Sequence, residues 1–109
     1  MENRADSSKP DVFGAIASEP RRVLLDQLAL GPTPVTQLAD SMNMSISAIS
    51  QHLSILKNAG LVENVKAGKQ RIYKLKAEPL KEVSAWVAHY QPFWQEKLKE
   101  LGRNLEETR

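Results

Sequence analysis

The sequence predicts a mainly helical fold with one small β-hairpin, an α+β architecture formed by a single domain over residues 11–109. Apolar residues recur at helical spacing in most of the chain, whereas residues 61–65 and 71–75 are typical of strands. A length of 109 residues is enough for one modest core. Residues 1–10 are polar and aperiodic, so we expect them to form a flexible tail.

The first two predicted helices are short. Val12, Phe13 and Ile16 indicate a helix directly after the tail. Ser18 is placed to cap the second helix, because a serine oxygen can accept a hydrogen bond from the first turn. The Gly-Pro-Thr-Pro run at 31–34 ends this helix and is expected to be a rigid connector.

A second helix pair follows at once. Thr36 is expected to cap a helix over 36–42, and Ser45 a helix over 45–59. Asn43 lies between them, and asparagine adopts the left-handed conformation that a sharp turn needs more easily than most residues. The spacing therefore predicts two helices that cross steeply.

The hairpin is the third part of the pattern. Its strands, 61–65 and 71–75, are joined across 66–69, where Gly68 supplies the positive φ of a tight turn. Gly60, just before it, is expected to end the preceding helix in the left-handed conformation. Two steeply crossed helices followed by a hairpin form a winged helix-turn-helix, in which the second helix enters the DNA major groove.

The outward face of the 45–59 helix is suited to DNA. With Ile49, Leu53 and Leu56 facing the core, the outward side chains are short and polar and include no carboxylate. Glutamine can pair with adenine through two hydrogen bonds, and serine can bond several base edges. We predict base contacts from Ile46, Ser47, Ser50 and Gln51.

Positive charge is concentrated in the same region. Residues 45–76 carry six basic side chains and one acidic side chain, whereas each end of the chain is close to neutral. Contacts to the DNA backbone, including a wing over 65–72 that lies on the backbone or in the minor groove, are predicted for Ser45, Ser54, Lys57, Lys66, Lys69 and Arg71. Lys74 and Lys76 lie further back, and both phosphate contact and plain solvation stay open for them.

The last helical pattern, about 79–107, is longer than so small a domain can cover. Its apolar stripe predicts a dimer with a second copy of the chain. Pro92 removes a backbone donor and should kink the helix near Ala88 or His89. The predicted interface residues in this helix are Val83, Trp86, Val87, Tyr90, Phe93, Trp94, Leu98, Leu101 and Leu105.

Several stretches resemble the ArsR-type (ArsR/SmtB) family of bacterial winged helix-turn-helix regulators. They are Ala-Ser-Glu-Pro-Arg-Arg-Val-Leu-Leu at 17–25, Val-Thr-Gln-Leu-Ala at 35–39, the Ser…His-Leu…Leu…Ala-Gly-Leu-Val pattern at 45–62, and Gly-Lys-Gln-Arg-Ile-Tyr at 68–73. The resemblance implies a homodimer that binds an inverted-repeat (palindromic) operator in double-stranded DNA and represses transcription. It also implies that helices at both chain ends form the dimer, which adds Val12 and Phe13 to the predicted interface. It places groove contacts on Ser47, Ser50 and Gln51 and wing contacts on Lys69 and Arg71.

Other functions are disfavoured. The chain has no cysteine, and the 34–39 segment, where relatives often carry metal-binding thiolates, has no ligand, so we expect neither a metal nor a cofactor. His52 is expected to make a packing or hydrogen-bonding contact. His89 together with Glu82 or Glu96 would provide few ligands for tight zinc binding. Nothing resembles a catalytic set, so an enzyme is not expected.

Three further expectations concern partners and location. The alternative function is a winged helix that contacts only other proteins, without specific DNA binding. Sensing of an apolar small molecule at Trp86, Tyr90 and Trp94, and repression without any effector, both stay open. No apolar run is long enough to span a membrane, and a cytoplasmic protein, associated with the nucleoid when bound to DNA, is expected.

Overall fold

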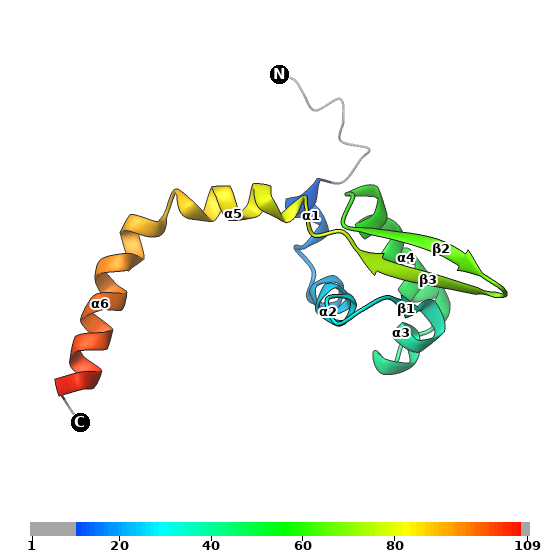
Figure 1. Ribbon diagram of the computed structural model, residues 1–109, viewed down its shortest axis with the longest axis horizontal. Coiled ribbons are helices and arrows are strands. Elements are labelled where there is room, and N and C mark those ends of the chain that lie inside the picture. The colour runs from blue at the N-terminus through cyan, green and yellow to red at the C-terminus, as the bar shows by residue number, and fades with distance from the viewer. Residues whose placement is uncertain (1–10, 108–109) are drawn as a thin grey trace, which may run out of the picture.

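The computed structural model describes residues 11–107, so the predicted tail at 1–10 lies outside the described residues. The described part is mainly helical with a small antiparallel sheet, as predicted (Figure 1). Its elements are α1 (Val12–Ala15), α2 (Glu19–Leu28), β1 (Thr33–Pro34), α3 (Val35–Ser41), α4 (Ile46–Asn58), β2 (Val62–Ala67), β3 (Gln70–Leu75), α5 (Leu80–Ala88) and α6 (Gln91–Glu107).

The sheet has three strands in the order β1-β3-β2. Strands β2 and β3 form the predicted hairpin, and they run closer to its tip than predicted, because Ala67 pairs with Gln70 across the turn. Gly68 has a φ of 65°, as a tight turn requires. The rigid connector expected at 31–34 includes a strand that was not predicted, because Thr33 and Pro34 form β1 and pair with β3.

Side-chain caps fix the starts of α1, α2 and α4, the last two as predicted. The Ser18 Oγ accepts a hydrogen bond from the Arg21 N–H at 3.3 Å, and the Ser45 Oγ accepts one from the Ala48 N–H at 3.0 Å. The prediction that Thr36 caps α3 is wrong. Pro34 occupies the cap position without a side-chain bond, and the Thr36 Oγ1 donates instead to the Gln70 Oε1 at 3.3 Å.

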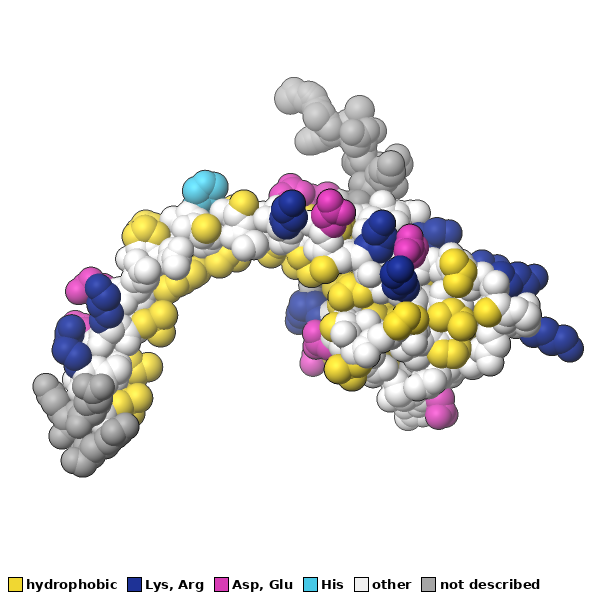
Figure 2. Space-filling view, in the orientation of Figure 1, with side chains coloured by type: hydrophobic (Ala, Val, Ile, Leu, Met, Phe, Trp, Pro, Cys, Tyr) yellow, Lys and Arg dark blue, Asp and Glu magenta, His cyan; other side chains and the backbone are white. Residues whose placement is uncertain are grey.

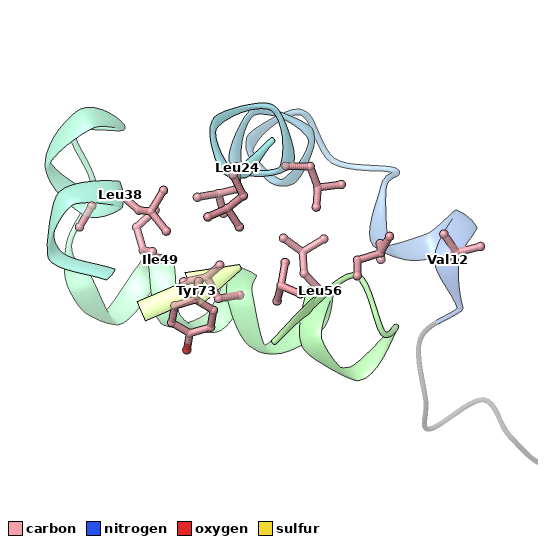
Figure 3. Close-up of a cluster of buried hydrophobic side chains, with 13 residues drawn as sticks. Val12, Leu24, Leu38, Ile49, Leu56 and Tyr73 are labelled. Carbon is pink, nitrogen blue, oxygen red and sulfur yellow. The ribbon is translucent and has the colours of Figure 1, made fainter. Parts of the chain in front are cut away.

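The core lies where α2, α3, α4 and the sheet meet (Figure 3). Its fully buried large side chains come from these three helices and from the residue before β2, and they are Leu24, Leu38, Ile49, Leu53, Leu56 and Leu61. Tyr73 of β3 closes one side of the cluster, with its hydroxyl directed away from it (Figure 3). The apolar faces predicted for the helices before the hairpin are therefore covered within the chain.

The C-terminal stretch is two helices rather than the single kinked helix predicted over 79–107. Helix α5 ends at Ala88, and α6 begins at Gln91 after a turn at His89 and Tyr90, beside the predicted kink. Pro92 lies in the first turn of α6, where the missing N–H costs no helical hydrogen bond. The proline therefore helps to start a new helix.

These two helices extend away from the rest of the chain (Figure 1). The radius of gyration is 18.3 Å, against roughly 13 Å for a compact domain of this length. We call residues 11–75 the body and α5 with α6 the arm. The hairpin projects from the body on the side opposite the arm (Figure 1).

Candidate nucleic-acid interface

Helix α4 presents the polar strip that the sequence predicted. Ile49, Leu53 and Leu56 are each 0% exposed, which fixes the rotation of the helix about its axis. The side chains on the opposite face are all exposed, and they are Ile46, Ser47, Ser50, Gln51 and Ser54. The strip contains no carboxylate, so nothing on it repels a phosphate backbone.

The turn before α4 sets its crossing with α3. Asn43 has a φ of 55°, which is the left-handed conformation predicted for it. The Met44 N–H then donates to the Ala39 carbonyl at 3.0 Å, and both Met42 and Met44 pack against the core. Ala39 is 4% exposed, so its small side chain lies inside the body, beneath the turn. The α3–turn–α4 unit therefore has helix-turn-helix geometry.

The hairpin forms the wing. Lys66 pairs with Arg71 in register near its tip, and Lys69 lies in the turn. All three side chains are exposed, and Figure 2 shows basic side chains gathered at this end of the body. The Arg71 Nη1 donates to the Asn64 Oδ1 at 3.0 Å, so Asn64 limits the directions in which that guanidinium can point.

A groove of about 620 Å³ separates the wing from the start of α4. It is lined by residues from three elements and the hairpin turn, none of them acidic, namely Val35, Thr36, Ile46, Ser50, Lys69, Gln70, Arg71 and Tyr73. Four of the predicted DNA-contacting residues, two from α4 and two from the wing, therefore line one cavity.

The other predicted contacts lie outside this groove. Ser54 and Lys57 are exposed further along α4, and Ser47 and Gln51 are on its outer surface. Lys66 is exposed on β2.

Two lysines left open by the sequence have acidic neighbours. The Lys74 Nζ lies 3.7 Å from the Glu63 Oε2, and the Lys76 Nζ lies 3.9 Å from the Glu63 Oε1. These exposed pairs contribute little stability, but they partly neutralise both lysines. The structure therefore favours plain surface charges over phosphate contacts for Lys74 and Lys76.

The sequence did not reveal three polar residues whose hydrogen bonds link the elements of this site, and they are Thr36, Gln70 and Arg21. Thr36 and Gln70 join the start of α3 to the wing through their 3.3 Å hydrogen bond. Arg21 reaches α4, where its Nη1 lies 3.4 Å from the His52 Nδ1. All of these contacts join residues about thirty positions apart, and neither spacing nor periodicity signals such pairs.

The arm carries most of the predicted dimer residues. Trp86, Tyr90, Phe93, Trp94, Leu98 and Leu101 are between 39% and 75% exposed. Figure 2 shows an apolar band along the concave side of the arm, with charged side chains opposite. Val12, in contrast, is 4% exposed in the chain's own core and offers almost no surface to a partner.

Two further predicted dimer residues, Phe13 on the body and Val83 on the arm, also contact the chain itself. Val83 and Phe13 pack against the core, and the Phe13 ring lies edge-to-face with Trp86 at a centroid distance of 5.8 Å. Phe13 and Trp86 thus join α1 to α5.

Within residues 11–107, no three His, Asp or Glu side chains gather as a metal site would require.

Known proteins with similar sequences are transcriptional regulators. A family model described as "Bacterial regulatory protein, arsR family" matches residues 18–64, from the cap of α2 into β2. Transcriptional repressor SdpR of Bacillus subtilis is 32% identical over 80 residues, which cover 73% of this chain and 89% of SdpR. HTH-type transcriptional regulator NmtR of Mycobacterium tuberculosis is 37% identical over 75 residues, which cover 69% of this chain and 62% of NmtR.

The same class appears among solved structures. A crystal structure of an ArsR family transcriptional regulator matches with a TM-score of 0.67 and 32% identity, covering 76% of this chain and 91% of that one. HlyU from Vibrio cholerae matches with a TM-score of 0.60 and 29% identity, covering 84% of this chain and 98% of HlyU.

The fold and the comparisons together show that the protein is a winged helix-turn-helix transcriptional regulator. The relatives named above are regulators, not enzymes. The chain belongs to the ArsR family. It spans 62% and 63% of the lengths of two matched Mycobacterium tuberculosis regulators, so parts of those proteins have no counterpart in the match. In residues 11–107, no helix has the length and apolar character needed to cross a bilayer.

Proposed function

We propose that the protein is a sequence-specific DNA-binding repressor that acts as a homodimer on an inverted-repeat operator. The observation that carries this proposal is the polar, carboxylate-free strip of α4 beside a basic wing, with the two opening onto one groove. In this arrangement α4 enters the major groove and Gln51 and the serines contact base edges. Lys69 and Arg71 contact the backbone or the minor groove.

The arm supports the dimeric part of the proposal. Its exposed aromatic and leucine side chains form a long apolar surface, and burial of such a surface is the dominant favourable contribution to association. A second copy of the chain presents the same surface and gives a two-fold arrangement. Two recognition helices related by such an axis match the two halves of an inverted repeat.

Repression and the extent of the domain are parts of the same proposal. The relative SdpR is named a transcriptional repressor, and a repressor needs only to occupy its operator. Residues 11–109 act as one DNA-binding domain with its own dimerisation arm. The protein would then work in the cytoplasm, where its DNA is.

Selection of bound sequences from random duplex DNA by the purified protein tests the proposal. We expect enrichment of an inverted repeat whose half-sites lie about one helical turn apart. Enrichment of no sequence would favour the alternative, a winged helix that contacts only other proteins. A single unrepeated motif would contradict the homodimer.

Two substitutions separate base contacts from backbone contacts on the selected operator. Gln51→Ala should weaken operator binding by about 1–3 kcal/mol and relax the preference at one position of each half-site. Lys69→Ala should weaken all sequences alike and lower the salt dependence of binding by roughly one phosphate contact per subunit. If both variants bind like the parent in titrations at several salt concentrations, α4 and the wing are not the DNA-contacting elements.

A further inference from the structure

Arg21, in the first turn of α2, joins three helices through one side chain. Its Nε donates to the Ala15 carbonyl at 2.7 Å, and its Nη2 donates to the Gly14 carbonyl at 3.3 Å. Its Nη1 lies 3.4 Å from the His52 Nδ1 on α4. The guanidinium therefore links α1, α2 and the helix proposed to contact DNA.

Helix α1 depends on such contacts for its position. It has four residues, too few to be stable alone. Asp11 caps its start, where the Oδ1 accepts from the Gly14 N–H at 2.8 Å. At its other end Arg21 binds two carbonyls, and Arg22 binds the Ile16 carbonyl at 2.8 Å.

Helix α1 is also where the body meets the arm. Phe13 projects from α1 against Trp86 of α5, and Trp86 in turn lies edge-to-face with Tyr90 at a centroid distance of 5.4 Å. Figure 1 shows α1 at the base of α5. Arg21 thus connects the helix that supports the arm with His52, the neighbour of Gln51 on α4.

The chemistry of the contact selects one tautomer of the neutral imidazole. An arginine side chain has only N–H donors, so the His52 Nδ1 must be the acceptor. The ring proton is then on Nε2, on the other side of the ring. His52 is also only partly exposed, so this bond and the surrounding side chains together restrict the rotation of its ring.

We propose that Arg21 is a positioning residue for base recognition, which holds His52 and the adjacent turn of α4 in a fixed place against α1. This inference rests on the proposed DNA-binding function. In this role Arg21 touches no DNA itself, and it acts by preorganising the Ser47–Gln51 side of α4. The competing role is that Arg21 is simply one more cation on the phosphates.

The neighbouring residue provides a matched control. Arg22 carries the same charge in the same turn and also binds a carbonyl of the α1 region, but none of its hydrogen bonds within residues 11–107 reaches α4. We therefore compare Arg21→Ala and Arg21→Lys with Arg22→Ala. The lysine variant keeps the charge, but its single nitrogen cannot hold both the carbonyls and His52.

The first measurement is binding to the selected operator and to unrelated DNA of equal length over a range of salt concentrations. Both Arg21 variants should lose about tenfold in the ratio of specific to non-specific affinity, with an unchanged salt slope, as expected for one lost hydrogen bond. Arg22→Ala should keep the ratio within about twofold. Circular dichroism and thermal melts check that each variant is folded.

The second measurement needs no DNA. In alkaline buffer, ¹⁵N NMR of the His52 ring should show a single tautomer with the proton on Nε2 in the parent and in Arg22→Ala. Both Arg21 variants should show a mixture of tautomers, because the acceptor at Nδ1 has lost its donor. A role in general stability alone would not select one nitrogen of one histidine.

Two results would overturn the inference. One is a fall in salt slope in Arg21→Ala that Arg21→Lys restores, which would make Arg21 a phosphate contact. The other is a mixture of His52 tautomers in the parent protein. If the parent prefers no DNA sequence, the proposed function fails, yet the NMR comparison still decides whether Arg21 fixes His52.

Discussion

The body and the arm use the same residue type in opposite ways. In the body, Leu38, Leu53 and Leu56 are each 0% exposed, whereas in the arm Leu98 and Leu101 are 59% and 56% exposed. Burying a leucine side chain is worth about 1.5–3 kcal/mol. The body therefore gains this stabilisation from its own chain, and the arm can gain it only from another surface.

A core substitution should show the largest effect. Leu53→Ala should lower the free energy of unfolding by about 2–5 kcal/mol, because it leaves a cavity beneath α4. Leu98→Ala should change it by less than about 0.5 kcal/mol at protein concentrations where the chain is monomeric. Urea titration followed by circular dichroism measures both, and equal losses would remove the distinction between body and arm.

The next effect concerns association. Leu98→Lys combined with Leu101→Lys should raise the dimer dissociation constant at least about 100-fold, since two charges replace apolar contacts. Sedimentation equilibrium over a range of concentrations measures this constant. Because α6 has 3.6 residues per turn, Glu96 and Glu100 lie on its opposite face.

The matched control uses those two glutamates. Glu96→Gln combined with Glu100→Gln makes the same change in net charge as the double lysine variant and should leave the dimer intact. If both double variants dissociate alike, net charge rather than the apolar face controls association. A parent protein that stays monomeric at every concentration would contradict the dimer itself.

The smallest effects are expected when a glycine is replaced by alanine, once in the body and once in the arm. Gly60→Ala should destabilise the body by about 1 kcal/mol, because Gly60 has a φ of 79°. Gly102→Ala should stabilise α6 by about 0.5–1 kcal/mol, because Gly102 is helical and an added Cβ meets no atom within 4 Å. Thermal melts of both variants measure the direction of each change in stability. Changes in the same direction would contradict the difference drawn between body and arm.

Local features of the fold were predictable from the sequence. The Ser18 and Ser45 caps, the left-handed Asn43 and the Gly68 turn each depend on a few neighbouring residues, and all four are confirmed. The rotation of α4 was predictable for a similar reason, because its apolar residues recur with helical spacing. The polar strip followed directly from that rotation.

Features that depend on distant partners were missed. Strand β1 has two residues, one of them a proline, and it exists because β3 is beside it. Thr36 bonds Gln70 rather than capping α3, because the wing places an acceptor within reach. Arg21 was not recognised because its partners are backbone carbonyls and a histidine 31 positions away.

The strand order has a consequence for solubility. Because β3 is central, β2 has one side without a strand partner in the described part of the chain, and its unpaired amide and carbonyl groups could recruit a strand from another molecule. Val65 on this strand is 62% exposed, but charged Glu63 and Lys66 lie close to it along β2. These charges discourage aggregation, so the basic wing also protects the sheet against edge-to-edge pairing.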